Sequence, residues 1–460
     1  MSTSDFNGGF VPRNINRETL LPALPSDTGS WGAVSAGAFF PYYSHGPHAS
    51  PQMPESLGAA AFAGESRMLV PLNQAPYFLY AESTGTGNVP LFEQFSAPIV
   101  PALVRAAADR AAEATAGRRP LRVVHIGPHL QRGGAEQWLL DLAGSLDPSV
   151  MQVVRHVTVQ PDAVDYSYVT ELMAANISVE VGGADAVQAA ARDADVLLSW
   201  GVQLDRYLGN GPRPPSLQIV HGDGPWNRWF LEGSRRSVDH FVAVSHRVQE
   251  IVCHDVPSTV IYNGIDGRRL ARSQGREETR QAFGFQEQDL VVAYCGRLAK
   301  EKRIDRIITA VAALPSHVTL LLIGTGYMEQ ELRELAEQTM PGRAVFTSTR
   351  NAAGDLYAAA DIFCMASDQE GCSLALLEAM LSGLPAVTTP VGCAAELIED
   401  RVTGLLFDGT PADLTRALSL LTDHRDWRHG MAAGGRRVVE RFGYARRMAR
   451  DYQRLVHGLC

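Results

Sequence analysis

The chain has 460 residues, which leaves room for two ordinary domains and a further segment, and its 45% of hydrophobic residues is typical of a globular protein. The sequence contains no run of about 18 apolar residues, so we expect no membrane-spanning helix. The net charge of −9 argues against nucleic acid as a main partner. The amino-terminal residues lack the pattern of a secretory signal, and the six cysteines form no CxxC pair. We therefore expect a cytoplasmic protein with reduced thiols and at most peripheral membrane contact.

Residues 1–97 are rich in Gly, Pro, Ser and Ala and carry few charges. Residues 1–97 show neither a helical nor a strand period, which predicts irregular structure, and a helical pattern follows over Pro98–Gly117. Two aromatic clusters, at 39–43 and 77–80, need burial or a partner. We interpret 1–120 as an accessory extension and not as a catalytic domain.

From Leu121 onward, predicted strands and helices alternate, which is typical of a parallel sheet covered by helices on both faces. The first series has strands expected at 123–127, 153–159, 177–180, 196–200, 217–220, 241–244 and 260–262. A second series runs from Val291 to about Phe407, and the polar segment 263–278 between them suits a hinge. The prediction is an α/β protein with two Rossmann-like domains, 121–265 and 266–440, and a last helix within 441–460.

Two carboxylates, Glu370 and Glu378, stand eight residues apart across a predicted strand–loop–helix corner. Ile362–Met365 is an apolar run typical of a buried parallel strand, so Glu370 lies in the loop at its carboxyl end and Glu378 about two turns into the next helix. Ligands of open α/β sheets bind at that edge. Two acidic groups there can accept hydrogen bonds from a polyhydroxylated ligand. The alternative is one charge in a helix's first turn and one solvated helix glutamate.

Only two of the 41 Lys and Arg residues are lysines, and both, Lys300 and Lys302, fall in one loop. With Arg297 they follow the predicted strand 290–294, in a pattern that suits a diphosphate clamp because an ammonium is a compact donor for phosphate oxygens. A solvated charged loop is the alternative.

Two further positions at strand ends are candidates. Gly133 and Gly134 precede a predicted helix, whose free N–H groups favour an anion or a sugar at close range. His221 ends the predicted strand 217–220 and can form a hydrogen bond with a sugar hydroxyl. A simple turn and a packed histidine are the alternatives.

Several segments, in order, resemble the retaining glycosyltransferases of the GT-B fold, the glycosyl-transferase group 1 set (family 4), over most of 121–460. These segments are HIGPHLQRGGAEQWLLDL, IVHGDGPW, FVAVSHRVQEIV, VIYNGID, CGRLAKEKRID, LLIGTGYMEQELREL and EGCSLALLEAMLSGLPAV, the last with the family's E-x7-E signature. One departure is Arg303, where the family's pattern usually has Gly.

The resemblance implies a role for each candidate. Glu378 accepts hydrogen bonds from ribose hydroxyls. Glu370 accepts them from the transferred sugar and His221 contacts that sugar, so these two are the expected catalytic residues. The remaining donor-binding residues are Arg297 and Lys302 on the diphosphate, Gly371, Cys372 and Ser373 through their backbone N–H groups, and Gly133 and Gly134 in the first loop. It also implies that the last helix crosses back to the first domain.

We therefore expect a hexosyltransferase that uses a nucleotide-diphosphate sugar, retains anomeric configuration and needs no cofactor or metal, since no HExxH or other metal-ligand spacing is present. The acceptor is open: a glycan, lipid, protein or small molecule. One alternative is a non-catalytic nucleotide-sugar binding or scaffold protein that uses 1–120 for interaction. Another is a hydrolase or epimerase on the same fold.

Overall fold

The computed structural model describes residues 119–460 apart from 161–163, 349–352 and 460, together with four short strands near the amino terminus. These strands are β1 (Trp31–Ala33), β2 (Ala38–Phe40), β3 (Leu69–Pro71) and β4 (Phe78–Tyr80). β1 pairs antiparallel with β3, and β2 with β4. The helix expected over Pro98–Gly117 lies outside the described residues. The chain divides after Arg118 into two units, and the second unit, Arg119–Cys460, contains both large parallel sheets.

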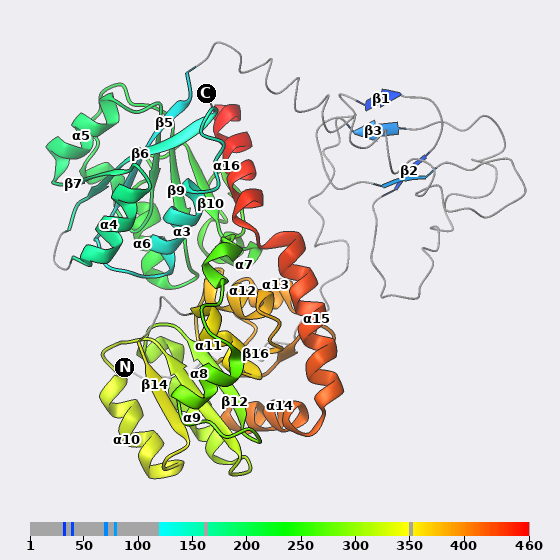
Figure 1. The fold of residues 1–460 in the computed structure, drawn as a ribbon. Coiled ribbons are helices and arrows are strands. Elements are labelled where there is room, and N and C mark those ends of the chain that lie inside the picture. Colours follow the sequence, from blue (N-terminus) through cyan, green and yellow to red (C-terminus); the bar gives the residue numbers. More distant parts are fainter. Residues whose placement is uncertain are drawn as a thin grey trace, which may run out of the picture. The chain divides into compact units, whose positions relative to one another are not determined.

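The first domain is built on a seven-stranded parallel sheet in the order β11-β10-β9-β8-β5-β6-β7. Its strands are β5 (Leu121–Gly127), β6 (Met151–Thr158), β7 (Ser178–Val181), β8 (Val196–Ser199), β9 (Ser216–Val220), β10 (His240–Ala243) and β11 (Ser258–Val260). Its helices are α3 (Gly134–Ala143), α4 (Tyr166–Ala174), α5 (Ala184–Arg192), α6 (Pro225–Glu232) and α7 (His246–Val252), with a 3-10 turn η3 (Leu204–Arg206). All the strands predicted for this domain are present, with small shifts at their ends. Figure 1 shows the sheet with its covering helices.

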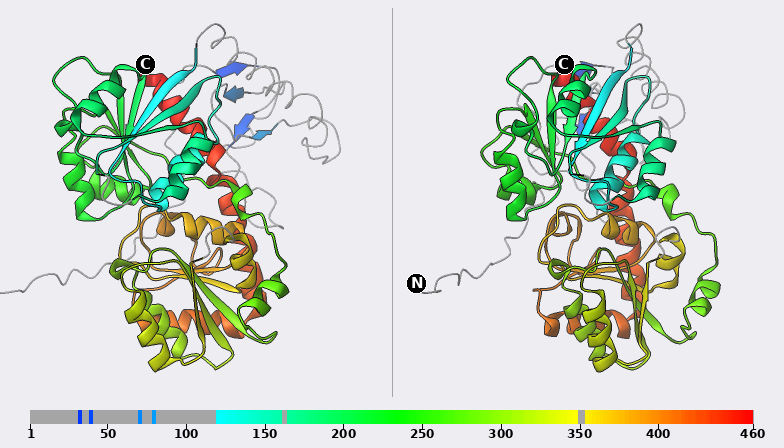
Figure 2. Two further views of the ribbon diagram at one scale, coloured as in Figure 1. Left: turned by 60° about the vertical axis from the view of Figure 1, so that its left-hand side comes forward. Right: turned by 90° about the vertical axis from the view of Figure 1, so that its left-hand side faces the viewer.

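The second domain has a six-stranded parallel sheet in the order β14-β13-β12-β15-β16-β17. Its strands are β12 (Leu290–Cys295), β13 (Val318–Ile323), β14 (Ala344–Thr347), β15 (Ile362–Met365), β16 (Ala386–Thr388) and β17 (Leu405–Leu406). Its helices are α8 (Arg276–Ala282), α9 (Ile304–Ala312), α10 (Glu329–Thr339), α11 (Ala353–Ala359), α12 (Leu374–Leu381), α13 (Ala394–Leu397), α14 (Pro411–Asp423) and α15 (Arg425–Phe442), with 3-10 turns η4 (Gly267–Leu270) and η5 (Lys300–Lys302). Helices cover both faces of each sheet, which confirms the predicted α/β class (Figure 2).

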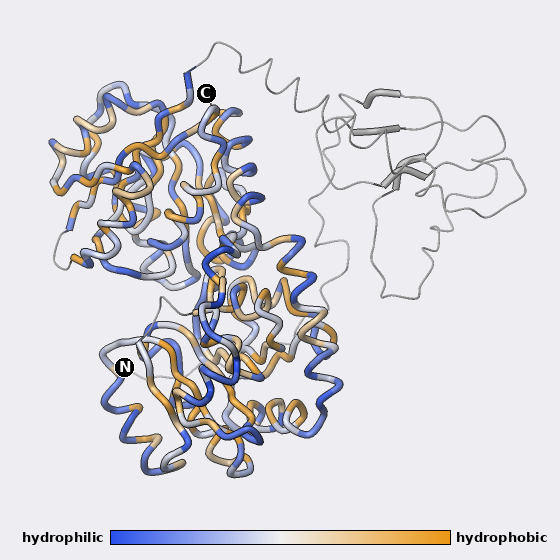
Figure 3. Tube along the Cα trace, in the orientation of Figure 1, coloured by the Kyte–Doolittle hydropathy of each residue, from blue (hydrophilic) through white to orange (hydrophobic). Residues whose placement is uncertain are grey.

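Apolar periodicity explains why these segments fold as they do. On α9, Ile304, Ile307, Ile308 and Val311 are buried, at the spacing of one helix face, and the helix packs against α14 and α10. Each such side chain contributes about 1.5–3 kcal/mol by leaving water. β13 is buried along its whole length, and apart from Thr319 its residues are apolar without alternation. The strands accordingly form the hydrophobic interior of both domains (Figure 3).

The chain crosses between the domains at two adjacent places. Ile265 N–H donates to the carbonyl of Gly443 at 2.8 Å, and Ala445 N–H donates to the carbonyl of Ile265 at 3.0 Å. Beyond this pair, the terminal helix α16 (Ala445–Leu459) packs on α3 of the first domain, with the Tyr452 ring 5.6 Å from Trp138. The terminal helix therefore belongs to the first domain's surface (Figure 1).

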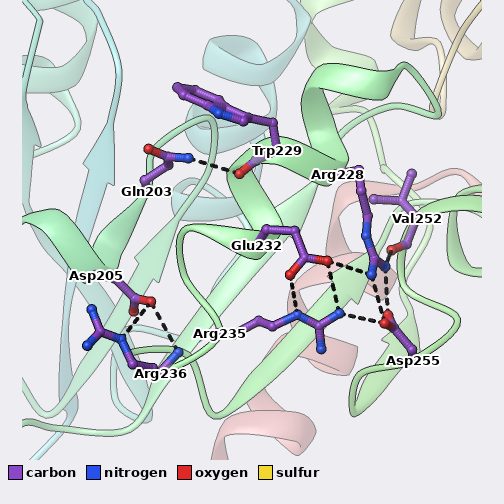
Figure 4. Close-up of polar contacts among 9 residues, drawn as sticks. All are labelled: Gln203, Asp205, Arg228, Trp229, Glu232, Arg235, Arg236, Val252 and Asp255. Carbon is purple, nitrogen blue, oxygen red and sulfur yellow. Dashed lines mark hydrogen bonds and ion pairs between the residues drawn. The ribbon is translucent and has the colours of Figure 1, made fainter.

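An ion-pair network fastens α6, the helix that follows the His221 loop. Arg228 and Arg235 each pair with both Glu232 and Asp255, so the end of α6 is tied to the loop after α7 (Figure 4). The hydrogen bond from Arg228 holds the pKa of Asp255 below its usual value, with a further contribution from Arg235. These groups lie at the surface, so the network fixes position more than it adds stability.

Among the described residues no helix is both long enough and apolar enough to cross a membrane.

The interdomain crossing leaves no room for a side chain at Gly264. A Cβ there would lie 2.6 Å from the carbonyl carbon and oxygen of Tyr444, which is backbone and cannot yield cheaply. We expect Gly264→Ala to lower the free energy of unfolding by about 1–3 kcal/mol in urea titrations. The control is Gly430→Ala on exposed α15, where nothing lies within 4 Å of the new methyl group. That change should be neutral or stabilise by about 0.5–1 kcal/mol, and equal effects of both would contradict the crossing geometry.

Candidate functional site

The loop after β15 brings Glu370 and Lys302 together. Lys302 Nζ donates to Glu370 Oε1 at 2.8 Å, and the Ser367 hydroxyl donates to the same oxygen at 2.7 Å. The Glu370 side chain is 12% exposed and that of Lys302 19% exposed. The structure thus joins two residues that the sequence placed in one donor site from segments 68 residues apart. A charge-assisted, partly buried pair of this kind fixes the carboxylate in one orientation.

Glu378 lies on α12, as predicted, but it is buried and not solvated. Its Oε1 is 2.8 Å from Arg269 Nη2, and its Oε2 accepts a 3.0 Å hydrogen bond from the Tyr357 hydroxyl. The alternative of a solvated helix glutamate is therefore wrong. Arg269 and Tyr357 were missed in the sequence, because neither lies in a recognisable motif and only the tertiary fold brings them to α12.

The α12 N-terminus meets the first domain directly. A Cβ on Gly371 would lie 2.1 Å from the carbonyl oxygen of His221, so no other residue fits without moving the two domains apart. The Cys372 carbonyl accepts a 2.8 Å hydrogen bond from Asn263 Nδ2, and the Ser373 hydroxyl caps the helix by accepting from Leu376 N–H. The positive end of the α12 dipole therefore lies where the two domains touch.

Arg297 has a different position from Lys302. Its side chain is 67% exposed and pairs with Glu301 at 3.0 Å. The structure therefore brings Lys302, but not Arg297, into contact with the signature carboxylate Glu370.

Arg303, which replaces the family's usual Gly, still adopts the left-handed conformation, with φ 50° and ψ 44°. That conformation costs a non-glycine residue about 1–2 kcal/mol. Its guanidinium forms ion pairs with Asp305 at 3.0 Å and Asp368 at 3.4 Å. The loop geometry that the substitution put in question is retained.

His221 packs edge-on against two tryptophans, with ring centroids 5.0 Å from Trp138 and 5.7 Å from Trp200. Its Nε2 is buried and has no hydrogen-bond partner among the described residues. Burial lowers the pKa of His221 to about 3, so the ring is neutral at neutral pH. A hydrogen bond from this neutral ring to a donor sugar stays a prediction.

The helix α3 begins at the predicted glycine pair, with Gly133 as its N-cap. The Glu136 carboxylate folds back over this position, 2.7 Å from where a Gly133 Cβ would lie, whereas Gly134 has open space around it. Glu136 is itself 3.3 Å from His129 Nδ1. An acidic side chain thus already occupies the positive end of α3, which suits a hydroxylated ligand better than a phosphate.

A buried histidine pair lies deeper in the first domain. His125 on β5 and His156 on β6 have their Nδ1 atoms 2.8 Å apart and their rings stacked at 5.0 Å. Both are almost fully buried, and burial lowers the pKa of each, that of His156 to about 4.

Within the described part of the chain, no three His, Cys, Asp or Glu side chains are grouped to hold a metal ion.

The two facing Rossmann-like domains and the seam between them define the GT-B class of fold. Solved structures agree: Anabaena Alr3699/HepE in complex with UDP and glucose aligns with a TM-score of 0.64 at 20% identity, over 74% of this chain and 100% of that one. WaaG, a glycosyltransferase involved in lipopolysaccharide biosynthesis, aligns with a TM-score of 0.56 at 18% identity, over 73% and 100%. At these identities the likeness shows the fold alone.

Residues 275–438, within the second domain, match the family model described as glycosyl transferases group 1. The lipopolysaccharide core biosynthesis mannosyltransferase LpsB of Rhizobium meliloti is 29% identical over 50% of this chain and 69% of its own length. The D-inositol 3-phosphate glycosyltransferase of Salinispora arenicola is 30% identical over 54% of this chain and 62% of its own. The chain thus spans about two thirds of these relatives.

The histidine pair predicts how stability depends on pH. In the unfolded chain both rings titrate near 6.5, whereas in the folded protein their pKa values are lowered, that of His156 to about 4. The unfolded state therefore binds protons first as the pH falls, and the free energy of unfolding should fall between about pH 6.5 and 4, by on the order of 3 kcal/mol from His156. Urea titrations at pH 7, 6 and 5 measure this slope.

Replacing one ring separates this effect from general acid unfolding. His156→Gln should lower stability at pH 7 and flatten the slope, while the exposed His429→Gln should leave both unchanged. An unchanged slope in His156→Gln would show that the pair does not control the acid response.

Proposed function

We propose that this chain is a retaining glycosyltransferase that moves a hexose-type sugar from a nucleotide-diphosphate sugar to a hydroxyl of an acceptor. The observation that carries the proposal is the ion pair between Lys302 and Glu370 beside the N-terminus of α12. Glu370 stands eight residues before the buried Glu378, and both lie in the region that matches the group 1 family. The names of relatives support it, among them a GDP-mannose-dependent alpha-mannosyltransferase of Mycobacterium tuberculosis. The HepE structure, which was solved in complex with UDP and glucose, also supports the proposal of a nucleotide-sugar donor.

The donor side follows from the contacts. Lys302 Nζ uses one of its three donors on Glu370, which leaves two for diphosphate oxygens. Glu370 is held by Lys302 and Ser367 and accepts hydrogen bonds from the transferred sugar, while Glu378 accepts them from the ribose. Arg297 joins the diphosphate by exchanging its bond with Glu301. The α12 N-terminus adds fixed positive potential toward the leaving group.

The reaction proceeds at the sugar's anomeric carbon. Its bond to the diphosphate oxygen breaks, and a bond to the acceptor oxygen forms on the same face. Because Lys302 neutralises Glu370, that carboxylate is a poor nucleophile, and we favour front-face departure over a covalent intermediate. The acceptor's proton passes to the leaving phosphate. Lys302, Arg297 and the helix dipole stabilise the charge of the diphosphate, so the proposal includes no divalent metal.

Substitution of the two signature carboxylates should affect different kinetic quantities, the donor dissociation constant for Glu378 and kcat for Glu370. Glu378→Gln and Lys302→Ala should each raise the donor dissociation constant by an amount equivalent to about 1.5–3 kcal/mol, because each loses a charge-assisted hydrogen bond in a closed site. Glu370→Gln should mainly lower kcat, since its partner is the transferred sugar. Calorimetry with UDP-, GDP- and ADP-sugars and steady-state kinetics measure both quantities, with the exposed Glu334→Gln as control.

Two outcomes would change the assignment. Folded Glu378→Gln and Lys302→Ala proteins with wild-type donor affinity would refute these donor contacts. If the wild-type protein binds the donor but transfers sugar to no acceptor, the alternative of a non-catalytic binding protein is favoured. Hydrolysis or isomerisation of the donor would favour the alternative of a hydrolase or epimerase.

The charge arrangement predicts that catalysis does not need a divalent metal. Activity should persist in excess EDTA and should not rise with Mn²⁺ or Mg²⁺, because the cationic groups of the second domain neutralise the leaving diphosphate. Loss of activity in EDTA with recovery on adding either ion would show the opposite.

A further inference from the structure

The hinge carries an ion-paired arginine, Arg269, to which the proposed function assigns no role. Arg269 lies on η4, four residues beyond the interdomain crossing at Ile265. Its Nη2 donates to Asp141 Oδ2 at 3.0 Å and lies 2.8 Å from Glu378 Oε1. Asp141 is on α3 of the first domain, and Glu378 is on α12 of the second. One guanidinium nitrogen therefore bridges the two domains from the segment that connects them.

Burial makes this bridge specific. The Asp141 side chain is 2% exposed and that of Glu378 9%, while Arg269 is 28% exposed. Among the described residues, Arg269 is the cation that the structure pairs with either carboxylate. Without it, two buried carboxylates would face each other with no counter-charge, which favours protonation or displacement of one of them.

In each carboxylate, the oxygen that does not contact Arg269 also accepts a hydrogen bond. Gln137 Nε2 donates to Asp141 Oδ1 at 3.2 Å, and the Tyr357 hydroxyl donates to Glu378 Oε2 at 3.0 Å. Each carboxylate is thus oriented by two donors. A carboxylate has about four acceptor sites, so Glu378 retains capacity for the two hydroxyls of a ribose.

We propose that Arg269 is a positioning residue of the donor site, which holds Glu378 in the orientation that receives the ribose hydroxyls and ties it to the first domain through Asp141. The inference rests on the proposed function, in which Glu378 accepts from the ribose. A rotation of the first domain about the Ile265–Tyr444 crossing would change the separation of Asp141 and Glu378, and a single nitrogen cannot then keep both bonds. Donor affinity and domain arrangement are therefore coupled through this side chain.

The test compares a nucleotide that has ribose hydroxyls with one that lacks them. UDP, GDP and ADP are titrated into the wild-type protein by calorimetry, and the tightest is compared with its 2′,3′-dideoxy counterpart. Arg269→Gln should raise the dissociation constant of the ribonucleotide about ten- to a hundredfold. It should leave that of the dideoxynucleotide within about twofold, since that ligand does not use Glu378, and Arg269→Lys should restore part of the loss.

The matched control is Arg268→Gln, at the neighbouring position of the same turn. The Arg268 side chain is 76% exposed and pairs with Asp266, so both dissociation constants should stay at the wild-type value. Asp141→Asn keeps the shape of the Asp141 side chain on α3 of the first domain but removes its negative charge. It should give the same selective loss to a smaller extent, and it carries the test if Arg269→Gln does not fold.

The outcomes are distinguishable. Equal weakening of both nucleotides would mean a merely structural role and would overturn the inference. A wild-type response in both Arg269→Gln and Asp141→Asn, with Glu378→Gln still impaired, would overturn it and leave the proposed function standing. A wild-type protein that binds none of the nucleotides would overturn the proposed function and this inference with it.

Discussion

The contact of Gly371 with the His221 carbonyl is the constraint on which the site depends. A methyl group at 371 would lie 2.1 Å from that oxygen, so this glycine sets how closely the α12 N-terminus approaches the first domain. The hydrogen bond from Asn263 to the Cys372 carbonyl holds the same loop from the hinge side. The signature carboxylates, Glu370 and Glu378, flank this contact in the sequence and lie at the seam because of it. The site is therefore a property of the two domains together.

Charge at the seam is arranged for orientation more than for stability. Glu370 is paired with Lys302, and Glu378 with Arg269, all in partly or fully buried positions. Taking such groups out of water costs nearly as much as their attraction returns, so a buried pair adds little net stability. It does fix each oxygen atom in place before a ligand arrives. A hydroxylated donor then meets acceptors that need no reorganisation, which is the condition for tight and specific binding.

Sequence patterns predicted most of the fold and the segments that bring Glu370 and Lys302 together, but not the partners of Glu378, for a physical reason. Periodicity of apolar residues is local, and it placed the strands, α12 and the corner that carries Glu370. Ion pairs between distant segments leave no local pattern. Arg269 and Tyr357 therefore stayed hidden, since the hinge segment is simply polar and Tyr357 sits in an ordinary short helix. The burial of Glu378 was undecided for the same reason, because burial depends on partners that arrive from elsewhere in the chain.

The state of His221 bears on which group can move a proton in the proposed reaction. With a pKa of about 3, its protonation at neutral pH costs on the order of 5 kcal/mol, so it does not act as a proton donor, and it is equally a weak base. Its partners, Trp138 and Trp200, keep water from the ring and maintain this state. A leaving phosphate, whose second ionisation lies near pH 6, is a far better proton acceptor. The same burial that removes the histidine from acid–base chemistry therefore favours the donor's own phosphate as the base.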